Sequence, residues 1–97
     1  MKFENKTFVI TGITSDIGRS IINQLVDKNA KLVLIGRNIK KVKELKEVLN
    51  LRKANYKVYV CDLKKNLQVL DTVEKIAKEN KVIDGIINVA GNWHNTS

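Results

Sequence analysis

The sequence predicts an α/β fold in which helices alternate with the strands of a parallel sheet. Four short runs rich in β-branched and other apolar residues are separated by longer segments whose apolar residues recur at helical spacing. Strands that alternate with helices of this length form parallel sheets through right-handed crossovers. The 97 residues include no proline and no linker-like stretch. A chain of this length accommodates one domain and not two, so we expect a single three-layer domain over residues 1–97.

Each element is expected from its own pattern. The first run ends at Gly12 and lacks polar alternation, which is typical of a strand buried on both faces. The segment after it should end as a helix near Asn29, since asparagine tolerates the left-handed backbone that often follows a helix. In chain order, the expected elements are a strand at Lys6–Thr11, a helix from Ile17 to near Asn29, a strand at Lys31–Ile35, a helix at Ile39–Leu51, a strand at Tyr56–Cys61, a helix at Leu67–Glu79 and a strand at Val82–Ile87.

A doubly wound sheet of four such strands has the order 3-2-1-4, with the first two helices on one face and the third on the other. The apolar face expected for the third helix consists of Leu67, Leu70, Val73, Ile76 and Ala77. That side of the sheet would be half bare, and Ile86 and Ile87 would border an open edge. Exposed apolar surface of this kind predicts self-association, marginal stability or a separate partner chain.

The net charge of +8 raises the question of a nucleic-acid partner. Basic residues concentrate around one expected helix, namely Lys40, Lys41, Lys43, Lys46, Arg52 and Lys53. They alternate with Glu44, Glu47 and apolar residues, which is the pattern of a solvated amphipathic helix, and no aromatic residues are interleaved for base stacking. We therefore expect no nucleic-acid partner.

Several other classes are disfavoured by composition. No apolar run approaches the roughly 20 residues of a membrane span, and residues 1–6 carry charges where a signal peptide would be apolar. We expect a cytoplasmic protein without a membrane partner. The lone Cys61 excludes an internal disulfide and Cys-x-x-Cys metal sites, so we expect a buried thiol and no metal.

The strongest local motif is the turn from Thr11 to Gly18, between the first strand and the first helix. A dinucleotide site needs a glycine where the strand turns and another where the helix packs on the strand, and Gly12 and Gly18 occupy these places. Phosphates would face the free N–H groups and the positive end of the helix dipole. The motif therefore predicts a dinucleotide site.

Three motifs together resemble the short-chain dehydrogenase/reductase family, most closely its ketoacyl reductases. They are the Thr11–Gly18 turn, the pair Asp62-Leu63 after the third strand, and Asn88-Val89-Ala90-Gly91 after the fourth. The resemblance implies the N-terminal half of a Rossmann fold, incomplete at its C-terminus, that binds a nicotinamide dinucleotide. The cofactor-binding residues implied are Gly12, Thr14, Ser15, Asp16, Ile17, Gly18, Arg37, Asn38, Asp62, Leu63, Asn88, Ala90 and Gly91.

Two residues depart from the family pattern. Asp16 stands where the family has a small residue, and a carboxylate about 5 Å from a phosphate would cost on the order of 1 kcal/mol. Alternatively, Ser15 or Asp16 caps the helix and occupies N–H groups that a phosphate would use. Both readings predict weaker dinucleotide binding. Val89 replaces an asparagine of the family signature and removes one amide.

The cofactor preference is expected to depend on the end of the second strand. NAD-binding domains place an acid there for the ribose 2′-hydroxyl, whereas this chain has Gly36-Arg37-Asn38. By resemblance, Arg37 would contact the 2′-phosphate of NADP(H), so NADP(H) is expected in preference to NAD(H). The alternative is a surface arginine that opens the next helix.

The family's catalytic Ser and Tyr-x-x-x-Lys motif follow the fourth strand, and this chain has neither. Val60 and Leu63 stand four residues after Tyr56 and Tyr59, where lysine would be needed. The resemblance implies the NADP(H)-binding part of an oxidoreductase with a carbonyl or hydroxyl substrate, whose catalytic segment lies outside this chain. The alternatives are a non-catalytic dinucleotide-binding regulatory module and a structural oligomerising domain.

Overall fold

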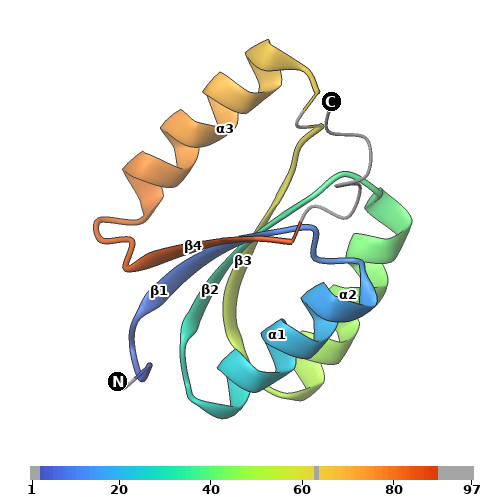
Figure 1. The fold of residues 1–97 in the computed structure, drawn as a ribbon, viewed down its shortest axis with the longest axis vertical. Coiled ribbons are helices and arrows are strands. Elements are labelled where there is room, and N and C mark those ends of the chain that lie inside the picture. Colours follow the sequence, from blue (N-terminus) through green and yellow to red (C-terminus); the bar gives the residue numbers. More distant parts are fainter. Residues whose placement is uncertain (1–2, 63, 90–97) are drawn as a thin grey trace.

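The computed structural model describes residues 3–62 and 64–89, which form four parallel strands and three helices (Figure 1). The sheet has the order β3-β2-β1-β4, as predicted. The elements are β1 at Thr7–Thr11, α1 at Asp16–Asp27, β2 at Lys31–Gly36, α2 at Ile39–Leu51, β3 at Asn55–Val60, α3 at Asn66–Glu79 and β4 at Gly85–Asn88.

Helices α1 and α2 cover one face of the sheet and form the larger core (Figure 1). Strand residues Phe8 and Ile10 from β1, and Leu32 and Leu34 from β2, alternate along the chain and point to this face. The helices contribute Ile22, Leu25, Val42, Leu45 and Leu49. Removing these side chains from water is the main force that holds the two helices on the sheet.

The opposite face carries a smaller core beneath α3, the helix drawn alone above the sheet in Figure 1. Val9, Val33 and Ile35 point to this side and meet Ile76 of α3. Cys61 joins them with an exposed fraction of 2%, which confirms the expected buried thiol. Cys61 lies just beyond β3, so the predicted strand Tyr56–Cys61 is displaced by one residue.

The expected apolar face of α3 is only partly buried. Ile76 is buried, but Leu67, Leu70 and Val73 are exposed, with exposed fractions of 83%, 63% and 56%. The helix turns Thr72 and Ile76 toward the sheet, and the rest of its apolar stripe has no layer to pack against among the described residues. The sequence periodicity identified an apolar stripe correctly but could not show how much of it is covered.

The fourth strand is shorter than the predicted Val82–Ile87. Its pairing with β1 begins at Gly85, and Asp84 just before it makes two hydrogen bonds with Thr7. The Asp84 carboxylate accepts the Thr7 N–H at 2.8 Å, and the Thr7 carbonyl accepts the Asp84 N–H at 2.8 Å. Val82 and Ile83 are exposed before the strand begins.

Strand β4 forms one edge of the described sheet, since only β1 pairs with it. Ile86 pairs in register with Val9, shares its face and is 73% exposed. Ile87 is half-buried against the larger core on the other face. Only one of the two isoleucines therefore lies on the bare side.

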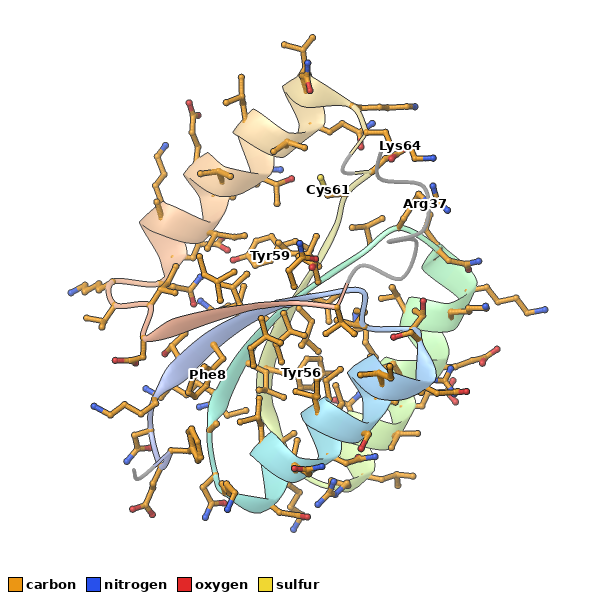
Figure 2. The ribbon with its side chains drawn as sticks, in the orientation of Figure 1. Phe8, Arg37, Tyr56, Tyr59, Cys61 and Lys64 are labelled. Carbon is orange, nitrogen blue, oxygen red and sulfur yellow. The ribbon has the colours of Figure 1, made fainter. Side chains whose placement is uncertain are left out.

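The two tyrosines of β3 point to opposite faces (Figure 2). The Tyr56 hydroxyl donates to Oδ1 of Asn50 in α2 at 2.6 Å, and the Tyr59 hydroxyl donates to the Glu79 carboxylate in α3. Burial, reinforced by the bond to Glu79, raises the pKa of Tyr59 above its ordinary value. Each hydroxyl therefore ties a helix to the sheet.

Within the described residues, no helix is long and apolar enough to cross a membrane.

Candidate functional site

The turn after β1 depends on two glycines. Gly12 has a φ of 68°, in the left-handed region that side chains disfavour. A Cβ atom added to Gly18 would lie 2.3 Å from the Gly12 carbonyl oxygen. Helix α1 can begin this close to the end of β1 only because position 18 has no side chain. This contact is the helix-to-strand packing that the motif predicted.

Ser15, and not Asp16, caps helix α1. The Ser15 hydroxyl accepts the Gly18 N–H at 3.0 Å and donates to the Gly12 carbonyl at 2.9 Å. Asp16 is the first helical residue and is exposed. Its negative charge is stabilised by the positive end of the helix dipole, the same feature that would attract a phosphate. In the first turn of α1, one backbone N–H is therefore bonded to Ser15, and the Asp16 carboxylate lies beside the remaining N–H groups.

A cavity of about 330 Å³ opens at the carboxyl ends of β1, β2 and β3. Five of the predicted site residues line it, namely Gly12, Thr14, Arg37, Asn38 and Asp62. The other lining residues are Thr11, Ile13, Ile35, Gly36, Lys41, Cys61 and Lys64. Ligands of open α/β sheets bind beyond the carboxyl ends of the strands, so this cavity is the candidate site.

The end of β2 contributes a cation to this cavity. Asn38 caps helix α2, and its Oδ1 accepts the Lys41 N–H at 3.1 Å. Arg37 lies between the strand and this cap, is exposed, and points away from the sheet at the end where the cavity opens (Figure 2). Asn38 is a lining residue, but its side-chain oxygen is already occupied by the helix. Its contribution to a ligand is limited to its remaining groups.

The end of β3 contributes the carboxylate of Asp62. Its Oδ1 accepts the Lys64 N–H at 3.0 Å, and its own N–H donates to Oε1 of Gln68 at 3.1 Å. These bonds hold the loop between β3 and α3. Leu63, which the family resemblance pairs with Asp62, lies outside the described residues.

The end of β4 is tied to β1. The Thr11 hydroxyl donates to Oδ1 of Asn88 at 2.6 Å, and the Val89 N–H donates to the Thr11 carbonyl at 3.2 Å. Asn88 therefore lies beside a lining residue without lining the cavity itself. Ala90 and Gly91 lie outside the described residues.

The structure adds two lysines to the site and leaves five of the described predicted residues outside the cavity, namely Asn88 and four residues at the start of α1. Ser15, Asp16, Ile17 and Gly18 form the start of α1 beside it, and Ile17 is 67% exposed. Lys41 and Lys64 line the cavity, although the sequence analysis assigned Lys41 to a solvated helix face. The available signal was the position of Lys41 three residues after a capping asparagine, which places it in the first turn of α2.

A second cavity, of about 650 Å³, lies at the opposite end of the strands, where they begin. It is larger, but ligands of this fold class bind beyond the carboxyl ends of strands, and neither glycine of the turn borders it. Among the described residues, no group of three or more His, Cys, Asp or Glu side chains could hold a metal.

The sheet order and the glycine turn at the carboxyl end of β1 define a nucleotide-binding α/β domain of the Rossmann type. The family model described as short chain dehydrogenase matches residues 6–97. The chain belongs to this family, and the predicted resemblance is confirmed.

Curated relatives are longer oxidoreductases. An uncharacterized oxidoreductase of Staphylococcus saprophyticus is 30% identical over 92 residues, which are 94% of this chain and 39% of that protein. The 3-oxoacyl-[acyl-carrier-protein] reductase of Buchnera aphidicola is 30% identical over 91 residues, which are 94% of this chain and 36% of that enzyme. The chain thus spans less than two fifths of the length of these two relatives.

Solved structures share the fold. The L-sorbose reductase from Gluconobacter frateurii, complexed with NADPH and L-sorbose, superposes with a TM-score of 0.79 at 24% identity, over 94% of this chain and 36% of that one. An NAD⁺-bound xylitol dehydrogenase superposes with a TM-score of 0.79 at 22% identity, over 89% of this chain and 33% of that one. Similar folds therefore carry either nicotinamide dinucleotide.

Gly18→Ala should destabilise the protein, although alanine is the better helix former by about 1 kcal/mol. The added methyl group would press on the Gly12 carbonyl, and crowding of this kind costs about 1–3 kcal/mol. Urea unfolding measures the change, with Ser20→Ala at an exposed position of α1 as the control, expected within about 0.5 kcal/mol of the unmodified protein. A Gly18→Ala variant more stable than the unmodified protein would contradict this packing.

Proposed function

We propose that this chain is the NADP(H)-binding part of a short-chain dehydrogenase/reductase that acts on a carbonyl or hydroxyl substrate. The observation that carries the proposal is the placement of Gly12 of the glycine turn and Arg37 on one cavity at the carboxyl ends of the strands. When bound there, the cofactor supplies or accepts a hydride at its nicotinamide ring.

The preference for NADP(H) rests on the charges at the cavity. Arg37 follows β2, where NAD-binding domains have the acid that binds the ribose hydroxyls. Asp62 is the carboxylate that lines the cavity among the described residues, and it follows β3 instead. A guanidinium matches a phosphate in geometry as well as in charge. The pocket is therefore better suited to a 2′-phosphate than to a free 2′-hydroxyl.

The proposed cofactor contacts divide by chemistry. The glycine turn after β1 and the start of α1 would hold the pyrophosphate. Arg37 and Asn38 would contact the adenosine ribose and its phosphate, and Asp62 and Leu63 would contact the adenine. Residues of the motif that follows the fourth strand would border the ribose on the nicotinamide side. The complete set is Gly12, Thr14, Ser15, Asp16, Ile17, Gly18, Arg37, Asn38, Asp62, Leu63, Asn88, Ala90 and Gly91.

We assign binding and orientation to this chain, and proton transfer to residues outside it. Neither tyrosine has lysine four positions later, and both hydroxyls are bonded to helices, Tyr56 to α2 and Tyr59 to α3. Domain 1–97 is thus proposed as a single binding unit. The cytoplasm is its proposed location, in keeping with the free thiol of Cys61.

A regulatory dinucleotide-binding module is the second candidate. The observation that favours it is Asp16, whose exposed carboxylate stands at the helix end that would meet the cofactor phosphates. Hydride transfer from NADPH by a longer polypeptide that includes Tyr-x-x-x-Lys would support the oxidoreductase. Tight binding without turnover in every native form would support the regulatory module.

The uncovered side of the sheet is proposed as a surface for a second copy of the chain. Exposed Ile86 and the stripe of Leu67, Leu70 and Val73 on α3 are apolar, and none of the residues of β4 is a charge or proline that would protect a sheet edge. Two copies related by a two-fold axis would cover each other's apolar surface.

NADPH should bind more tightly than NADH, and Arg37→Ala should remove the preference. Loss of a charge-assisted contact at this exposed position is expected to weaken NADPH binding about tenfold and leave NADH binding within about twofold. Calorimetric titration measures both affinities, with Lys43→Ala on the exposed face of α2 as the control. Equal losses for the two cofactors, or for the two variants, would count against the assignment of Arg37.

Asp16→Ser should strengthen the binding of NADPH and of NADH by the same factor, because both cofactors contain the pyrophosphate. Removing one like charge at about 5 Å is worth on the order of 1 kcal/mol, or about a fivefold tighter affinity. The same titration measures it, and Glu47→Ser on the exposed face of α2 is the control. Unchanged affinities would show that the carboxylate of Asp16 does not face the phosphates.

Ile86→Lys should shift the protein from dimer to monomer by adding an edge-protecting charge to β4. Size-exclusion chromatography with light scattering measures the mass. The control is Leu51→Lys, at an 85% exposed leucine in the last turn of α2 on the covered side of the sheet, which should leave the dimer intact. A monomeric unmodified chain would refute the proposed association.

A further inference from the structure

Two lysines line the candidate cavity together with Arg37. Lys41 comes from the first turn of α2, and Lys64 comes from the loop between β3 and α3. Figure 2 shows Arg37 and Lys64 at the same end of the sheet, on the loops that follow β2 and β3. The cations therefore approach one opening from two separate elements.

These cations are not neutralised within the structure. The ion pairs among the described residues are Arg52 with Asp27 and Lys75 with Asp71. None of the three cavity cations takes part in one. Asp62 is the only acid in the described lining, so the lining residues carry an excess of two positive charges, three cations against one carboxylate. Such an excess attracts an anion of more than one charge.

The backbones of both lysines are held in place beside the cavity. The Lys41 N–H donates to Oδ1 of Asn38 at 3.1 Å, and the Lys64 N–H donates to Oδ1 of Asp62 at 3.0 Å. Both acceptor residues also line the cavity. Both residues are exposed, so each lysine provides a tethered positive charge in the lining of the cavity.

We infer that Lys41 and Lys64, together with Arg37, form a cationic clamp for the ribose phosphate of an adenosine nucleotide. This inference rests on the proposed function and extends it by naming two residues that set the preference for a 2′-phosphate. A phosphomonoester carries about 1.5 to 2 negative charges near neutral pH, which one arginine does not balance. Arginine supplies the directional contact, and the lysines supply additional point charges from the same cavity lining.

The test uses 2′,5′-ADP and 5′-ADP as probes, because they differ in the ribose phosphate and need no nicotinamide contacts. Lys41→Met and Lys64→Met keep the length of the side chain and remove the charge. Lys40→Met and Lys65→Met are matched controls, since these neighbouring lysines are exposed and do not line the cavity. Titration calorimetry measures affinity, and circular dichroism checks that each variant is folded.

Each cavity variant should bind 2′,5′-ADP about three- to fivefold more weakly, as expected for one exposed charge pair, while the controls stay within about twofold. The double variant should also lose part of the salt dependence of binding, because fewer charges are screened. Binding of 5′-ADP should change by less than about twofold in every variant.

Different failures point to different errors. Equal affinities of the cavity variants and the controls, while Arg37→Ala still weakens 2′,5′-ADP, would overturn the clamp and leave the proposed function standing. Equal losses for 5′-ADP would also overturn it, since the lysines would then contact the 5′-phosphates. Absence of binding of either probe to the unmodified chain would overturn the proposed function itself.

Discussion

The close approach of helix α1 to the end of β1 is the constraint on which the rest of the site depends. Gly18 lies so near the Gly12 carbonyl that a single added carbon would fall 2.3 Å from it. The approach aims the positive end of the helix dipole at the edge where β1, β2 and β3 end. A bulkier residue at Gly18 would push the helix away from the end of β1 and disturb the turn whose Gly12 and Thr14 line the cavity.

The two faces of the sheet are unequal, and this difference governs stability. One face is covered by two helices and carries most of the buried apolar side chains, whereas the other has only α3. Apolar residues on α3 and on β4 consequently stay in water at a free-energy cost that grows with exposed area. This chain spans less than two fifths of the length of the two curated relatives. An additional layer over that face is the arrangement that would remove the cost.

Charge at the cavity has two opposing parts. Arg37, Lys41 and Lys64 gather at the ends of β2 and β3, while Asp16 stands at the start of α1. In the proposed function, the cations would favour an anion at the adenosine end of a dinucleotide, and the carboxylate would disfavour one at the pyrophosphate. Affinity and cofactor preference would then depend on different residues, so each could change without the other.

Local patterns in the sequence determined the element order, the parallel sheet and the glycine turn, because they depend on side-chain periodicity and on residues such as Gly12 that suit one backbone geometry. The ends of elements and the buried part of α3 were decided by tertiary contacts. Asp84 is bonded to Thr7 just before β4 begins. Leu67 is exposed because no further layer covers it among the described residues. Lys41 and Lys64 are far apart in sequence, and neither carries a local signal for the other. Only the parallel sheet, which brings the ends of β2 and β3 to one edge, places them on a common cavity.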